Sequence, residues 1–371
     1  MIIPFVKTLY GLGPAERLIA ELLEDDSRYD DLLTELEHNG LGLYTAYLLQ
    51  TSEVRLELPG SFRERLKRLQ LAGFAQNMLI RKETEALLHK LDGCGIPVIP
   101  LKGTMLAERY FGSFSARGTS DIDLLVRPEH LEAAVQCVRE AGYDQPAADS
   151  PIHYHTEWMK DAPGLPEPLT VELHWSLTSS SSAAMRLDEA WRHSEPLSGF
   201  RHARICSAAY TFYALCLHGA SHQMDSNKHI IDLMHMIVRH HEDISLPEVL
   251  QLARQDRTLG RVKAAMSVVY ALAPELSERL PLPFRTAVRF WKRAFLQRGS
   301  EPHSDGFKLR RWLFTFHMLD SWPYRWRHVR QLLLPSVQLA AYSVDDADAR
   351  SSTAGLYLRL YRQRLRKLMG G

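Results

Sequence analysis

The stretch PVIPLKGTMLAERYFGSFSARGTSDIDLLV (residues 97–126) decides the fold. It opens with the short apolar run PVIPL, which is typical of a strand and ends at Lys102-Gly103. A short helix, TMLAERYFG, and a polar loop are expected next. The stretch closes on DIDLLV (121–126), in which acidic and apolar residues alternate before the chain becomes wholly apolar. This pattern predicts a strand that enters a core from a polar rim.

Downstream of this stretch the pattern predicts one helix and two more strands. Residues 128–142 begin with a proline and end at a glycine, as helices often do. Residues 152–160 and 169–177 alternate with period two, which is typical of strands. We therefore expect a small mixed α/β block over residues 96–178.

Helical periodicity is expected on both sides of this block. Residues 14–93 carry apolar side chains at spacings of three and four, and a capping box of Ser61 and Glu64 predicts the start of a long helix. The pattern becomes helical again from about residue 205, whereas DSWPYRW (320–326) resembles a loop. The expected fold class is α+β: a small mixed sheet flanked by N-terminal helices and a C-terminal helical domain. The expected domains are residues 1–95, 96–178 and 179–371.

The composition excludes several classes of protein. Lys plus Arg (45) and Asp plus Glu (44) almost cancel over the 371 residues, so general nucleic-acid binding is not expected. The four cysteines form no CxxC pair, which disfavours a thiolate zinc site or a disulfide scaffold. No signal-peptide pattern and no transmembrane run of roughly 20 apolar residues is present, so a cytoplasmic location is expected. The basic C-terminal run LYLRLYRQRLRKLM suits a solvated helix face or, alternatively, an anionic membrane surface.

Two aspartates and one glutamate are the candidate catalytic and metal-binding residues. Asp121 and Asp123 lie two residues apart on one strand, so both carboxylates point the same way. Two such anions repel each other unless a cation lies between them, and Mg²⁺ suits oxygen ligands best. If the strand that carries Glu172 pairs nearby, three carboxylates meet and hold two metal ions. An isolated Asp-x-Asp pair is otherwise often only a solvated strand end.

A phosphate-binding turn precedes the aspartates. Lys102-Gly103 ends a strand and begins a helix, so backbone amides and the positive helix end are available to a phosphate. Glycine allows close approach to the backbone, and Thr104 adds a hydroxyl.

In this order of elements the chain resembles the polymerase-β-type nucleotidyltransferase superfamily. LKG, DIDLLV, the acid before an HW pair and the segment LHGASHQMDSNKHIIDL are similar to the bacterial "uncharacterised nucleotidyltransferase" family over roughly residues 75–240. The superfamily has Gly-Ser where this chain has Gly103-Thr104, which keeps the hydroxyl.

The resemblance implies two-metal transfer of a nucleotidyl group from an NTP, expected to be ATP, to a peptide or small-molecule acceptor. Asp121 and Asp123 would bind Mg²⁺ or Mn²⁺, and Glu172 would complete the metal site or act as the base. Two alternatives remain: phosphoryl transfer to a peptide by the same site, and a non-catalytic nucleotide-binding scaffold.

The expected nucleotide-binding residues are Lys102, Gly103, Thr104, Arg117, Ser120, His218, Lys228 and Asp232. Arg117 would clamp a triphosphate, or it is only solvated. His218, Lys228 and Asp232 would close the nucleotide cleft, or they only pack. A zinc site at His218 and His222 is disfavoured because Gly219 stands where an HExxH motif has glutamate. His174 would orient Glu172 or contact a phosphate, or it is a hydrogen-bonded histidine at a domain seam.

Overall fold

The computed structural model describes residues 1–13, 27–145, 154–163, 167–296, 305–335 and 353–369, together with Val337, Ala340 and Val344. The helix predicted at residues 14–26 and the start of the strand predicted at 152–160 lie outside the described residues.

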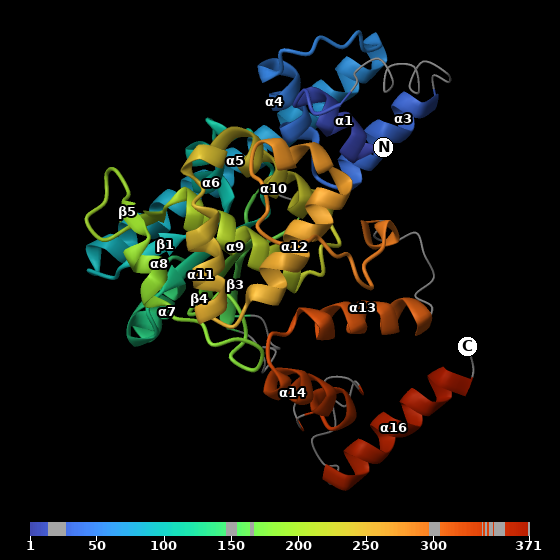
Figure 1. Ribbon diagram of the computed structural model, residues 1–371. Coiled ribbons are helices and arrows are strands. Elements are labelled where there is room, and N and C mark those ends of the chain that lie inside the picture. The colour runs from blue at the N-terminus through green and yellow to red at the C-terminus, as the bar shows by residue number, and fades with distance from the viewer. Residues whose placement is uncertain are drawn as a thin grey trace.

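A four-stranded mixed sheet lies at the centre of the fold (Figure 1). Its strand order is β1-β2-β4-β3, in which β2 and β4 are parallel and both edge strands are antiparallel to their neighbours. The strands are β1 (Val98–Pro100), β2 (Asp121–Val126), β3 (His155–Lys160) and β4 (Leu169–His174). A two-stranded sheet of β5 (Ser194–Pro196) and β6 (Arg204–Cys206) lies beside β1.

One face of the four-stranded sheet is apolar and packs against helices. Side chains of β2 alternate between faces, so Ile122, Leu124 and Val126 point away from the aspartates and are buried. They share a core with α5 (Gly60–Gly93) and α7 (Leu131–Glu140), which follows the short 3₁₀ turn η1 (Pro128–His130). The opposite, polar face of the sheet therefore points toward the remaining helices.

The larger core lies in the helical parts on the other side. The helix α9 (Ala208–Ser221) packs against α10 (Asn227–His240), α11 (Leu246–Gln255) and α12 (Leu259–Leu272), and α1 (Ile2–Leu9) packs against α4 (Gly42–Thr51) and α10 (Figure 1). The other helices of this part are α3 (Ser27–His38), α6 (Gly103–Phe111) and α8 (Asp188–Arg192). Short 3₁₀ turns lie at η2 (His241–Asp243), η3 (Pro274–Glu278) and η4 (Arg293–Leu296).

A C-terminal arm extends from this body. The helix α13 (Asp305–Met318) contacts α12, while α14 (Trp322–Leu333) and α16 (Thr353–Met369) lie farther out (Figure 1). The arm includes a small separate cluster of Ala340, Leu356 and Leu360. Among the described residues, no helix combines the length and the apolarity that crossing a bilayer requires.

The fold class predicted from the sequence, α+β with helices on both sides of a small mixed sheet, is confirmed, and β2 has the predicted bounds. Two local predictions are wrong. The long helix α5 has Pro59 at its N-cap and no side-chain cap, so Ser61 lies inside the first turn and cannot form the capping box. In the expected loop DSWPYRW (320–326), only Asp320 and Ser321 precede α14, and the residues from Trp322 onward are helical, because proline is tolerated in a first helical turn. The three domain boundaries stay predictions; β6 lies beyond residue 178 yet contacts β1.

Candidate functional site

Three carboxylates meet on the polar face of the sheet. Asp123 of β2 lies opposite Glu172 of β4 in the parallel register, and Asp121 lies two residues earlier on the same face. One ligand atom from each of these three residues lies within 4.8 Å of the other two. The condition on which the sequence-based hypothesis depended, that Glu172 reaches the aspartates across two strands, is therefore met in the structure.

Asp123 has a buried carboxylate with one oxygen already bound. Its Oδ1 lies 2.8 Å from Lys102 Nζ and 3.1 Å from His174 Nε2. Burial alone would raise the pKa of Asp123, but Lys102 and His174 lower it far below the usual range, so the group is ionised. Its Oδ2 is buried and accepts no hydrogen bond from any residue that the structure describes. Because buried polar atoms are normally satisfied, this oxygen fits a cation ligand.

Lys102 supplies the fixed positive charge beside the cluster. Burial lowers the pKa of Lys102, but the attraction of Asp123 and Asp121 outweighs it and raises the value to about 12. Lys102 is the N-cap of α6, so the first turn of this helix begins next to the carboxylates. Gly103 has a φ of +76°, which favours glycine, and a Cβ there would stand 3.5 Å from the main-chain oxygen of Asp121. The main-chain N–H groups of the first turn of α6 can donate hydrogen bonds to a phosphate oxygen close to the metal ligands.

The loop before the aspartates is anchored by α5. Asn77 is buried, and its amide donates to the main-chain oxygens of Phe114 and Arg117, each at 2.8 Å. Its Oδ1 accepts from the main-chain N–H of Thr119 at 3.2 Å. The Thr119 hydroxyl in turn donates to the main-chain oxygen of Asp121 at 3.2 Å. Gln76, the preceding residue of α5, also donates to the main-chain oxygen of Thr119 at 3.0 Å, so two neighbouring amides of α5 hold the chain where it enters β2.

The buried Arg117 joins this loop to the C-terminal helices. Its Nε and one terminal nitrogen each donate to a carboxylate oxygen of Asp232 on α10, both at 2.8 Å. Both side chains are about 95 % buried or more, with exposed fractions of 5 % and 3 %. The Arg117 guanidinium is therefore not merely solvated, because it forms an ion pair with the carboxylate of Asp232.

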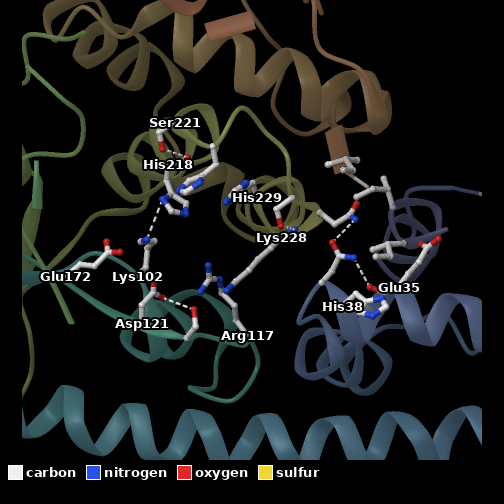
Figure 2. A pocket seen from close by; sticks show the side chains of 18 of the residues that line it. Glu35, His38, Lys102, Arg117, Asp121, Glu172, His218, Ser221, Lys228 and His229 are labelled. Atoms are coloured by element: carbon white, nitrogen blue, oxygen red, sulfur yellow. Dashed lines mark hydrogen bonds between the residues drawn. The ribbon is translucent and has the colours of Figure 1, made fainter. Parts of the chain in front are cut away.

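A cavity of about 1180 Å³ opens over the carboxylates. Figure 2 shows Lys102, Asp121 and Glu172 at one end and Glu35 and His38 of α3 at the other. Arg117 and Lys228 lie between the two ends. The cavity is larger than the roughly 300–1,000 Å³ of typical ligand pockets, so one nucleotide would not fill it.

The structure places the predicted nucleotide-binding residues in two groups. Those that line the cavity are Lys102, Arg117, Ser120, His218 and Lys228. The others, Gly103 at the first position of α6, Thr104 and Asp232, are buried and do not line the cavity. The Thr104 hydroxyl has no hydrogen-bond partner among the described residues, and nothing places it on the cavity surface.

The imidazole rings of His218, His222 and His229 gather on the wall opposite the sheet. Their ring centroids are 4.7–5.2 Å apart. Burial, together with Lys102 and the other two rings, lowers the pKa of His218 well below its usual value, so this ring is neutral. Within the described part of the chain, this trio is not among the groups whose ligand atoms converge within 4.8 Å. The geometry therefore gives the zinc alternative at His218 and His222 no support.

Sequence reasoning missed His155, His229 and Tyr154, which also line the cavity. His155 lies on a predicted strand with period-two alternation, and this alternation puts His155 on the same face of the strand as Glu157. Its partner across the sheet, His174, could not be identified before the order of the strands was known.

Comparisons with known proteins give one match. No curated protein and no solved structure matches the chain. A family model described as "Uncharacterised nucleotidyltransferase" matches residues 25–273, which include the whole sheet, the three carboxylates and the helices α3, α9 and α10 beside the cavity. The helix α1, which also lines the cavity, lies outside the matched residues. The match spans well over half of the 371 residues. The chain therefore belongs to the uncharacterised nucleotidyltransferase family, and it is a transferase enzyme.

Proposed function

We propose that the protein transfers a nucleotidyl group from an NTP, with ATP as the expected donor, to a hydroxyl of a peptide or small-molecule acceptor. The observation that carries this proposal is the meeting of Asp121, Asp123 and Glu172 beside the first turn of α6. Membership of the family supports nucleotidyl transfer in general. The acceptor and the donor base belong to the proposal.

The cavity wall offers cations to a triphosphate. Lys102 and the first turn of α6 lie next to the carboxylates, and Lys228 projects from the first turn of α10. The side chain of Lys228 forms no ion pair with another described residue. Burial and repulsion by Arg117 lower the pKa of Lys228 to about 8, so it is mostly charged at neutral pH and short of a counter-ion. A phosphate oxygen would provide that counter-ion.

The proposed reaction is a displacement at phosphorus. The acceptor oxygen attacks the α-phosphorus, the bond from this phosphorus to the bridging oxygen breaks, and pyrophosphate leaves. Asp121, Asp123 and Glu172 would hold Mg²⁺ or Mn²⁺, which when bound neutralises phosphate charge in the transition state. Alternatively, Glu172, which has 19 % of its side chain exposed, would act as the base that takes the acceptor proton instead of completing the metal site. The remaining residues position the reactants, which is the main catalytic contribution in phosphoryl and nucleotidyl transfer.

The far end of the cavity would hold the acceptor. It is lined by α1 and α3, including Glu35 and His38, and by Asn39, which follows α3. Glu35 and His38 are polar and lie across the cavity from the carboxylates (Figure 2). A hydroxyl-bearing peptide or small molecule that enters from this side reaches the sheet next to the proposed phosphate site.

Labelled ATP tests the proposal. With candidate acceptors and Mg²⁺, label at the α-phosphate is expected in the product, with release of pyrophosphate. Asp123→Asn should reduce product formation by about 10³-fold or more, because it removes charge from the metal site. Product labelled only from the γ-phosphate would establish phosphoryl transfer instead.

Calorimetric NTP binding addresses the scaffold alternative. Binding is expected to need a divalent cation and to weaken in Asp121→Ala/Asp123→Ala. Binding that is indifferent to both the cation and the substitutions would favour the non-catalytic scaffold.

A further inference from the structure

A second group of possible metal ligands adjoins the three carboxylates. The edge strand β3 is antiparallel to β4, and its register places His155 directly opposite His174. Both imidazoles therefore lie on the face that carries Glu172, and their ring centroids are 4.8 Å apart. One ligand atom from each of His155, Glu172 and His174 lies within 4.8 Å of the other two.

We infer that His155, Glu172 and His174 form a binding site for a divalent transition-metal ion of the Zn²⁺, Co²⁺ or Mn²⁺ class. The site shares Glu172 with the aspartate cluster but has a different set of donor atoms. Its occupancy does not depend on which group the enzyme transfers.

The donor atoms favour a transition metal over Mg²⁺ at this position. Two imidazoles and one carboxylate are a ligand set of zinc and other first-row transition-metal sites in proteins. Magnesium instead requires oxygen ligands in a nearly octahedral arrangement, which Asp121 and Asp123 suit. The polar face of the sheet therefore carries an oxygen-rich end and a nitrogen-rich end, with Glu172 between them.

The distances are close to those of a filled site. His174 Nε2 lies 2.9 Å and His155 Nε2 lies 4.0 Å from Glu172 Oε2. Ligand atoms bound tetrahedrally at about 2.0–2.1 Å from a metal stand roughly 3.3–3.5 Å apart, so small side-chain rotations suffice.

The surroundings of the three ligands also suit a metal ion. His155 and His174 are held in place by burial, with 10 % and 7 % of their side chains exposed. Glu157 Oε1 lies 3.6 Å from His155 Nε2, so a second carboxylate borders the site next to this imidazole. The cavity lies over the site, so ions can enter.

The test is a Co²⁺ titration of the metal-free protein in excess Mg²⁺, which occupies oxygen-rich sites. Co²⁺ with fewer than six ligands absorbs visible light far more strongly than the hydrated ion, so a saturating band at one ion per chain is expected. His155→Ala should weaken this binding by about 100-fold or more. His155→Gln, which keeps a polar side chain of similar size, should weaken it as well and serves if the alanine variant fails to fold.

Two variants are matched controls. His222→Ala removes an imidazole from the opposite wall of the same cavity, and Asp121→Asn alters the oxygen-rich site; both should keep the Co²⁺ band. An equal Co²⁺ affinity in wild type and in a folded His155 variant would overturn the inference. So would loss of the band in His222→Ala with retention in His155→Ala. Failure of nucleotidyl transfer in the labelling assay leaves this titration unaffected, so the two proposals can fail separately.

Discussion

Lys228 is a cavity cation whose charge changes within about one pH unit of neutrality. Its pKa is lowered from 10.5 to about 8, first by burial and then by repulsion from Arg117. A triphosphate binds the protonated amine better, so NTP affinity should be steady below pH 8. It should then fall with increasing pH, by at most about tenfold per pH unit for one titrating group. Isothermal titration calorimetry across this range measures the effect.

Two substitutions separate this charge effect from other titrations. Lys228→Arg keeps a positive charge throughout and should remove the loss above pH 8. Lys228→Met should weaken binding at neutral pH and also flatten the profile. A decline of equal steepness in Lys228→Arg would assign the titration to another group. In the ligand-free protein, the unfolded state binds more protons at this residue between about 8 and 10.5, so Lys228 makes the free energy of unfolding rise with pH there.

At the scale of elements, the contact between α5 and the loop before β2 decides where the aspartates lie. Asn77→Ala would leave two main-chain oxygens and one N–H without their partner. We expect the free energy of unfolding to fall by about 2–4 kcal/mol, since each buried unsatisfied group costs about 1–3 kcal/mol and some will reach water. Chemical denaturation measures this, and Mg²⁺-dependent NTP affinity should fall with it because the loop leads into Asp121.

A matched amide elsewhere controls for the loss of a helical side chain. Gln136 lies on the exposed surface of α7 and bonds only Glu140 at 3.0 Å among the described contacts. Gln136→Ala should change the free energy of unfolding by less than about 0.5 kcal/mol. If Asn77→Ala were as mild as this control, the loop would not depend on Asn77.

The strands of the sheet and the faces of their side chains were predictable from the sequence, but the pairing of the strands was not. Alternation in DIDLLV predicted both the bounds of β2 and the shared face of Asp121 and Asp123. The same period shows which face a residue occupies but not which strand lies beside it. The assignment of Glu172 to the site therefore required knowing that β4 pairs with β2. The assignment of His155 required the register between β3 and β4, and only the structure supplies both.

Contacts between distant residues were missed for the same reason. Arg117 and Asp232 are 115 residues apart, and both were predicted to bind the nucleotide, yet nothing in the sequence pairs them. The strands β5 and β6 have three residues each, too few for a period to be recognised. Such features depend on tertiary packing, which local patterns do not encode.

At the scale of the whole molecule, the core around the cavity is separate from the outermost arm. The family match ends at residue 273, and α16 packs in its own small cluster with Ala340, Leu356 and Leu360. By contrast, Asp320, just after α13, accepts hydrogen bonds from the main-chain N–H groups of Leu259 and Gly260 at the start of α12. The arm therefore has an inner part tied to the body and an outer part that is not tied to it by these contacts.

A chain that ends at Pro335 keeps α13, α14 and the Asp320 cap, and we expect it to bind Mg²⁺ and NTP like the full chain. At a nucleotide concentration of about 100 times Kd, the free energy of unfolding of both the shortened and the full chain should increase by about 2.7 kcal/mol, because only the folded state binds nucleotide. Calorimetric melting with and without nucleotide compares the two shifts. Asp320→Ala in the full chain should instead lower the melting temperature without nucleotide, since it uncaps α12 at a cost of about 1 kcal/mol. A smaller nucleotide-induced shift in the shortened chain would show that α16 contributes to the nucleotide site, which would then extend beyond the residues that the family shares.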